Sequence, residues 1–210
     1  MNKRTLQCRI LLLATLLIGA GVQAQTVSAA EKEKALKYLE STKQGVTDAT
    51  KGLTPEQWNF KAGPDRWSIA QCVEHIAAAE DLLFGMITNQ VMKAPARPKP
   101  EDLVVLDEMV ITRVPDRSHK AQAPEPLKPT DRFGSPDAAL KHFDDSRDKT
   151  IAFLGDTPDL RAHATDSPLG KQLDGYEWIL FIAAHSDRHT KQILEVKADP
   201  KFPEGTAAGF

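Results

Sequence analysis

The sequence predicts an all-α protein: a four-helix bundle with a long irregular connection between its second and third helices. Four segments place apolar residues at helical spacing over several turns, which is the pattern of a helix that buries one face. Each segment begins at a residue typical of a helix N-cap. Between the second and third segments, residues 93–134 hold seven of the 14 prolines, and this composition interrupts regular structure.

The first two expected helices each begin with a capping box, in which the N-cap side chain and a residue three positions later satisfy each other's backbone amides. Ser28 and Glu31 form the first box, and Ser68 and Gln71 form the second. A short capped turn is expected from Thr54 between them. The apolar line of the first helix comprises Leu36, Leu39, Val46 and Ala49, and that of the second comprises Ile69, Val73, Ile76, Leu83 and Ile87, with Glu80 as a polar exception.

The connection contains one segment, residues 102–113, that suits either a short helix or a short strand. The third helix is expected to begin at Ser135, which a proline follows at the first helical position. The fourth is expected to run from Asp174 to about Lys197. The stripe of the third helix comprises Leu140, Phe143, Arg147, Ile151 and Leu154.

The first 24 residues have the pattern of a secretory signal peptide. MNKRTLQCR is positively charged, ILLLATLLIGAG is apolar but short for a membrane span, and VQA supplies a small-x-small cleavage site. We therefore expect an exported protein, periplasmic or secreted, with a bundle domain over residues 25–198 and a flexible tail over 199–210. Cleavage after Ala30 is the alternative. No second apolar stretch predicts membrane contact once the signal is removed.

The charge balance and the cysteine count limit the partners and the disulfides that can be expected. Removing residues 1–24 leaves 24 basic and 29 acidic side chains and no basic run, which argues against a nucleic-acid partner. Cys72 is then the single cysteine, so no internal disulfide is expected. Its position on a core-facing helical stripe is typical of a small buried hydrophobe rather than a reactive thiol.

Two histidines lie on the face of the fourth helix that is expected to be buried. At ~100° per residue, the narrow sector of that face comprises Trp178, Ile182, His185, His189 and Val196. Imidazoles four positions apart can reach one common point, a spacing found in metal-binding helices. Two ordinary core histidines at this spacing also occur, so the pair alone is a weak motif.

His75 on the second helix supplies a third candidate ligand, because inward residues of two bundle helices can converge on one site. Three imidazoles leave a fourth coordination position open, the arrangement of catalytic zinc. We therefore expect a divalent metal at His75, His185 and His189, with zinc as the default and nickel or iron as alternatives. His119 and His163 fall in irregular segments, and His142 falls away from its stripe.

Two charged residues on apolar stripes are further candidates. Glu80 is a candidate for the carboxylate that orients a metal-binding histidine, and an exposed acid at the helix edge is the alternative. Arg147 is a candidate for binding an anionic substrate. The alternative is a stem packed on the core with its charged head in water. Glu74 projects ~100° away from His75 on the helix, so no role as a base is assigned to it.

The histidine segments carry a family resemblance. WSIAQCVEHIAAAEDLLFGMI, followed much later by GYEWILFIAAHSDRHTKQI, resembles the DinB-like superfamily of four-helix-bundle metalloproteins over roughly residues 30–197. The resemblance implies that His75, His185 and His189 are the family's metal ligands, and Trp67, Ser68 and Gln192 match the family's pattern nearby. It also implies a homodimer. The signal peptide and the proline-rich connection depart from many relatives.

Three functions from different classes remain open. We rank first an exported metal-dependent hydrolase that acts on an unidentified small molecule. A thiol-dependent transferase or isomerase, as the family resemblance implies, is the second. A non-enzymatic bundle that binds a metal or another ligand is the third. We find no nucleophile motif, glycine-rich phosphate loop or CxxC motif in the sequence, so the metal must carry any chemistry.

Overall fold

Helices account for most of the regular structure in the computed structural model, which describes residues 26–96 and 102–205. The expected signal peptide, residues 1–24, lies outside the described part of the chain. The helices are α1 (Ala29–Thr50), α2 (Pro55–Asn59), α3 (Ile69–Asn89), α4 (Leu103–Arg113), α5 (Pro136–Asp156) and α6 (Gly175–Lys197). The short elements are the 3-10 turns η1 (Val91–Lys93) and η2 (Glu125–Leu127) and the strands β1 (Ala164–Asp166) and β2 (Gln172–Asp174).

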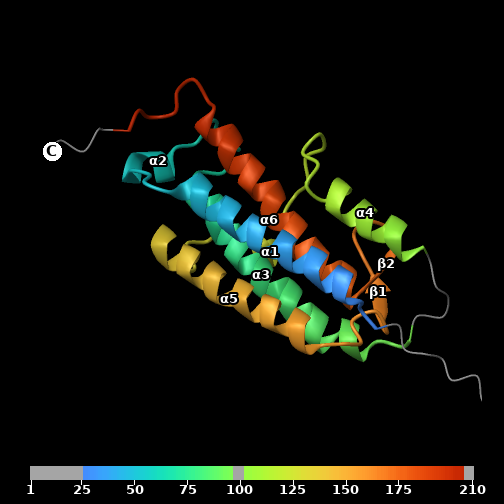
Figure 1. Cartoon of the computed structure of the whole chain (residues 1–210). Helices are drawn as coiled ribbons and strands as arrows, with labels where there is room; N and C mark the ends of the chain where they lie inside the picture. Colours follow the sequence, from blue (N-terminus) through green and yellow to red (C-terminus); the bar gives the residue numbers. More distant parts are fainter. Residues whose placement is uncertain (1–25, 97–101, 206–210) are drawn as a thin grey trace, which may run out of the picture.

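Four long helices, α1, α3, α5 and α6, form the predicted bundle (Figure 1). Helix α6 packs between α1 and α3, and α5 closes the bundle against α3 and α1. Figure 1 shows that α3 and α5 run in the same direction, whereas α1 and α6 run in the opposite one. A chain that places two consecutive long helices in parallel must return along the bundle between them. The long connection from α3 to α5 makes that return.

The N-caps expected from the sequence are confirmed. Capping boxes begin α1, α2, α3 and α6, and the Ser135 side chain accepts the Ala138 N–H at the start of α5. Each cap satisfies a backbone amide that the helix itself leaves free. The caps therefore fix where α3 and α6 begin, and with them the height of their histidines along the bundle.

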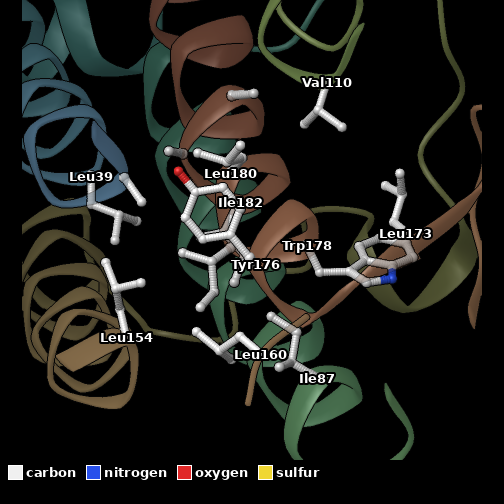
Figure 2. Close-up of a cluster of buried hydrophobic side chains, with 14 of the residues drawn as sticks. Leu39, Ile87, Val110, Leu154, Leu160, Leu173, Tyr176, Trp178, Leu180 and Ile182 are labelled. Carbon is white, nitrogen blue, oxygen red and sulfur yellow. The ribbon is translucent and has the colours of Figure 1, made fainter. Parts of the chain in front are cut away.

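Most of the buried hydrophobic core lies in two large clusters. Figure 2 shows one of them, in which side chains from α1, α5 and α6 gather around Tyr176. The Tyr176 ring is fully buried, and its hydroxyl donates to the Glu31 carbonyl oxygen at 2.8 Å. The second cluster includes Val46, Val73, Ile76, Phe143 and Ile193. Each fully buried side chain of this kind stabilises the fold by about 1.5–3 kcal/mol.

Residues 102–113, which the sequence left open, form the helix α4 from Leu103, and this helix packs against α6. A two-stranded antiparallel hairpin, β1–β2, precedes α6 and pairs Ala164 with Asp174. This hairpin was not predicted from the sequence, because its strands of three residues are too short for period-2 alternation to stand out.

A buried arginine joins the segments at the N-terminal end of α6. Arg161 lies 2.8 Å from Asp107 and 2.6 Å from Glu31, with Asp174 and Glu177 at 3.2 and 3.5 Å. These carboxylates come from α4, α1, β2 and α6. One guanidinium therefore links α1 and α4 to the β2–α6 junction, three parts of the chain that are distant in the sequence.

Residues 199–205, the beginning of the expected flexible tail, contact α2 and its C-cap. The Phe202 ring meets the Phe60 ring edge-on at 5.5 Å, and the Gln57 amide donates to the Pro203 carbonyl at 3.0 Å. Residues 206–210 lie outside the described part. Across residues 26–96 and 102–205, no helix has the length and apolarity that a bilayer span requires.

Candidate metal centre

The three predicted ligand histidines meet in the interior of the bundle. His75 comes from α3, and His185 and His189 come from α6. Their ring centroids lie 4.3 Å (His75–His189), 4.5 Å (His185–His189) and 4.9 Å (His75–His185) apart. One nitrogen from each ring lies within 4.8 Å of the other two. Residues 110 positions apart in the chain are thus brought to one point.

The hydrogen bond of His75 fixes which of its nitrogens faces the cluster. His75 Nδ1 lies 2.8 Å from the carbonyl oxygen of Leu127. A carbonyl only accepts, so Nδ1 carries the proton and a neutral ring leaves Nε2 with a free lone pair. Nε2 lies 3.2 Å from His185 Nε2. The η2 turn of the long connection therefore sets the tautomer of His75.

A second hydrogen bond sets the tautomer of His189. His189 Nδ1 lies 2.8 Å from Gln192 Oε1, and Arg117 Nη1 donates to the same oxygen at 3.3 Å. Because an arginine only donates, its contact assigns the oxygen position of the Gln192 amide. Glu195 holds Arg117 through two bonds of 2.6 and 2.7 Å. His189 Nδ1 is therefore a donor, and its Nε2 is free to accept a metal.

Burial keeps the three imidazoles neutral. His75 and His189 are almost entirely inaccessible to solvent. Burial lowers the pKa of His75, although the bond to Leu127 opposes this shift. Burial also lowers the pKa of His185 and of His189 well below the usual value, and the neighbouring histidines lower both further. Neutral imidazole is the form that ligates a metal.

The donor set and its spacing fit a divalent metal ion. At metal–nitrogen distances of 2.0–2.1 Å, two ligands of a tetrahedral zinc are about 3.3 Å apart. The 3.2 Å between His75 Nε2 and His185 Nε2 matches this separation. Each of two rings also has an acceptor for its second nitrogen, which is typical of metal-binding histidines. The Trp67 ring packs on His75 at 4.8 Å and on His189 at 6.2 Å between centroids, and covers one side of the cluster.

Arg147 does not have the exposed head that the sequence analysis allowed. The side chain is fully buried, and all five of its N–H groups have acceptors. Two bonds of 2.8 Å go to Glu80, and the others go to Leu39 O, Thr42 Oγ1 and Ser186 Oγ at 2.8 Å each. No donor remains for an anionic substrate.

Glu80 is the partner of that arginine and has neither predicted role. Its carboxylate is buried, so it is not a solvated acid at the helix edge. Its second partner is the hydroxyl of Thr150 at 2.9 Å. Within the described residues, no hydrogen bond joins Glu80 to one of the three histidines. The prediction failed because a polar residue on an apolar stripe has the same pattern whether it faces a metal or a buried opposite charge.

The remaining candidates lie outside the cluster. His142 is partly exposed and lies 2.6 Å from Asp81, and His119 is exposed. His163 forms an isolated bridge with Ala96. Cys72 is fully buried, as expected, and burial raises its thiol pKa to about 12. Such a thiol is not a nucleophile near neutral pH.

Two residues that orient the histidines were not assigned this role from the sequence. Gln192 lies three positions after His189, so helical spacing with an amide side chain was sufficient to propose the contact. The acceptor on Leu127 is a backbone carbonyl in an irregular segment 52 positions from His75. Nothing in the side-chain pattern indicates it.

Fold and site together define a four-helix-bundle protein with a largely buried three-histidine cluster. The family model of the DinB superfamily matches residues 38–193, and the chain belongs to this superfamily. It is 26% identical over 148 residues to the uncharacterized protein YuaE of Bacillus subtilis (strain 168). The aligned region covers 70% of this chain and 87% of YuaE.

The fold is also similar to a solved structure. That structure is YfiT from Bacillus subtilis, described as a probable metal-dependent hydrolase with an unusual four-helix bundle topology. The similarity has a TM-score of 0.51 at 17% identity and covers 82% of this chain and 89% of YfiT. At this identity the comparison supports the shared bundle topology.

Proposed function

We propose that this protein is an exported hydrolase that depends on a divalent metal held by His75, His185 and His189. The observation that carries the proposal is the convergence of three imidazoles, of which those of His75 and His189 are buried and have their Nδ1 protons bound elsewhere. The description of YfiT as a probable metal-dependent hydrolase supports the same reaction class. Zinc is the metal we propose first, with nickel or iron as alternatives, because imidazole suits all three.

The chain's own residues hold the site ready for a metal. Leu127 O and Gln192 Oε1 keep protons on Nδ1 of His75 and His189, which leaves Nε2 of each ring available. The Trp67 ring packs against the rings of His75 and His189. When bound, a divalent ion acts as a Lewis acid and makes water acidic enough to ionise near neutral pH. With Cys72 buried and protonated, water is the nucleophile that this proposal requires.

The test of the site is metal stoichiometry by elemental analysis. Wild type should reconstitute with about one ion, as a three-ligand site holds. His75→Ala, His185→Ala and His189→Ala should each lose it. His142→Ala is the matched control, because it removes a histidine that also has a partner from another helix, and it should retain the metal. A wild type that takes up no metal, or ligand variants that retain it like the control, would refute the site.

The test of the reaction is a screen of esters, amides and lactones with the metal restored. Hydrolysis that disappears in His189→Ala and survives in His142→Ala is the expected result. Turnover that requires an added low-molecular-weight thiol would assign the transferase or isomerase activity instead. Metal binding without turnover of any substrate would favour the non-enzymatic bundle.

We also propose export and a homodimer. Export rests on the charged, apolar and small-residue pattern of residues 1–24. Fractionation should find a mature chain that begins near Gln25 outside the cytosol, and a full-length cytosolic chain would contradict it. Sedimentation of the metal-loaded protein should show a dimer at micromolar concentration, and a monomer would remove that proposal.

A further inference from the structure

Glu74 adjoins His75 but faces away from the cluster, toward the connection between α3 and α5. Its carboxylate is buried and accepts three consecutive backbone N–H groups. These are the amides of Thr130 at 2.7 Å, Asp131 at 3.0 Å and Arg132 at 3.2 Å. One side chain of α3 therefore anchors the irregular segment that follows η2.

This anchor requires an uncommon backbone conformation. Asp131 has a φ of 63°, in the left-handed region that residues other than glycine seldom adopt. Aspartate tolerates that region better than most residues. The turn presents its amides to a single carboxylate, and the bonds to Glu74 offset the cost of this conformation.

Arg132 extends the anchor to the carbonyl that orients His75. Its Nε donates to Glu74 Oε1 at 3.2 Å. Its Nη1 donates to Pro126 O at 2.9 Å and its Nη2 donates to Lys128 O at 2.6 Å. These two carbonyls flank Leu127, whose own carbonyl accepts the Nδ1 proton of His75 at 2.8 Å.

The geometry points to Glu74 and Arg132 as positioning residues of the metal centre. They hold the Leu127 carbonyl against His75, keep the ring's proton on Nδ1 and leave its Nε2 for the metal. The inference rests on the proposed metal site and adds the origin of one ligand's tautomer. The hydrogen bonds lead from Glu74 to Arg132, from Arg132 to the carbonyls on either side of Leu127, and from Leu127 to His75, which is the residue next to Glu74.

A guanidinium is needed for this role because it must reach a carboxylate and two carbonyls at once. Its planar fork provides several donors in fixed directions, whereas a lysine ammonium is a compact point charge. Arg132→Lys therefore retains the charge near Glu74 but loses the geometry. Glu74→Gln retains the volume but replaces one acceptor oxygen with a donor. Both variants should release the segment around Leu127.

The matched control is Glu125→Gln. Glu125 lies in the same segment and pairs with Lys128 at 2.5 Å, but both of these side chains are exposed. This variant removes a carboxylate from η2 whose partner is the exposed ammonium of Lys128, whereas Arg132 binds the backbone carbonyl of that residue.

The first readout is long-range ¹H–¹⁵N NMR of the histidine side chains in the metal-free protein. Wild type and Glu125→Gln should show His75 with its proton on Nδ1. Glu74→Gln and Arg132→Lys should lose that single tautomer. The second readout is zinc affinity by competition with a chromophoric chelator. Affinity should fall about 10- to 100-fold in the two anchor variants, as it does when a group that orients a metal ligand is removed.

Three results would overturn the inference. One is a wild-type protein in which His75 carries its proton on Nε2, and the wild-type spectrum alone would show this. Another is an unchanged tautomer, with zinc affinity within about twofold of wild type, in either anchor variant that folds. The third is an equal loss of affinity in Glu125→Gln. If wild type binds no metal, the proposed function fails, but the tautomer readout still decides the role of Glu74 and Arg132.

Discussion

Two of the ligand histidines are buried and His185 is partly buried, and this burial determines how the protein should respond to acid. In the folded protein the pKa of His75 is lowered, and those of His185 and His189 are lowered well below the usual value. Between ~6.5, the ordinary histidine value, and these lower values, the unfolded chain binds protons that the folded chain does not. The metal-free protein should therefore lose stability as the pH falls below ~6.5.

The affinity for zinc should also decrease as the pH falls. Because protons compete with the metal for neutral imidazole, and the folded pKa values are low, we expect affinity to change little until the pH falls below ~6.5. Chelator competition measured at a series of pH values would test this, with His142→Ala following the wild-type curve. Affinity that already falls as the pH passes through ~6.5 would show that the rings titrate like exposed histidines.

The buried pair of Glu80 and Arg147 should contribute to stability rather than to catalysis. Glu80→Gln or Arg147→Met leaves a charged partner buried without its counter-ion, and such changes cost about 3–5 kcal/mol. Urea unfolding of the metal-free variants would measure the loss. The double variant Glu80→Gln/Arg147→Met should be less destabilised than the sum of the two single variants, because it leaves no uncompensated charge.

The control for this pair is an exposed ion pair on the same helix. Lys141 and Asp145 lie 2.6 Å apart on α5, and both side chains are more than half exposed. Lys141→Met should change stability by less than about 1 kcal/mol. If Arg147→Met costs no more than this control, the buried pair is not the constraint that its contacts indicate.

At the scale of the helices, alanine substitutions at two glycines would test how tightly the helices pack. A Cβ at Gly175, the first residue of α6, would lie 2.9 Å from Leu160 O and 3.1 Å from Met92 Sδ. Gly175→Ala should therefore destabilise the protein by about 1–3 kcal/mol. Gly85 in α3 has no atom within 4 Å of such a Cβ, so Gly85→Ala should stabilise the helix by about 1 kcal/mol. Thermal unfolding of both variants would measure these opposite shifts.

The helices of the bundle could be predicted because their determinants are local. Ser68 with Gln71 and Asp174 with Glu177 define helix starts within four residues of sequence, and the structure confirms both boxes. The spacing of His185 and His189 likewise depends on one helix. These features need no knowledge of the tertiary structure.

The contacts that could not be predicted from the sequence join residues that are far apart in the chain. Arg147 meets Glu80 across 67 positions, and Arg161 meets Glu31 across 130. A side-chain pattern shows a charged residue on an apolar face but does not show what lies opposite. The same limit explains the Leu127 carbonyl, because backbone acceptors have no sequence signature. The fold was therefore more predictable than the surroundings of the candidate site.

At the scale of the whole molecule, the candidate site joins the two helices that run in opposite directions at the centre of the packing. Helix α3 contacts α5 and α6, and α6 contacts α1 and α3. The long connection adds a third attachment through Leu127. A metal bound at this point would act on three segments of the chain at once, rather than on one helix pair.

The 110 positions between His75 and His185 give such a metal the character of a removable cross-link. It would close a loop that begins within α3, contains α4, α5 and the hairpin, and ends within α6, whereas α1 lies outside that loop. A closed loop restricts the ways in which the enclosed elements can separate. Zinc should then slow amide hydrogen exchange in α3 and α6 more than in α1, as followed by exchange mass spectrometry. Equal slowing in all three helices would indicate global stabilisation alone, whereas slower exchange inside the loop would mean that metal supply decides which part of the bundle opens first.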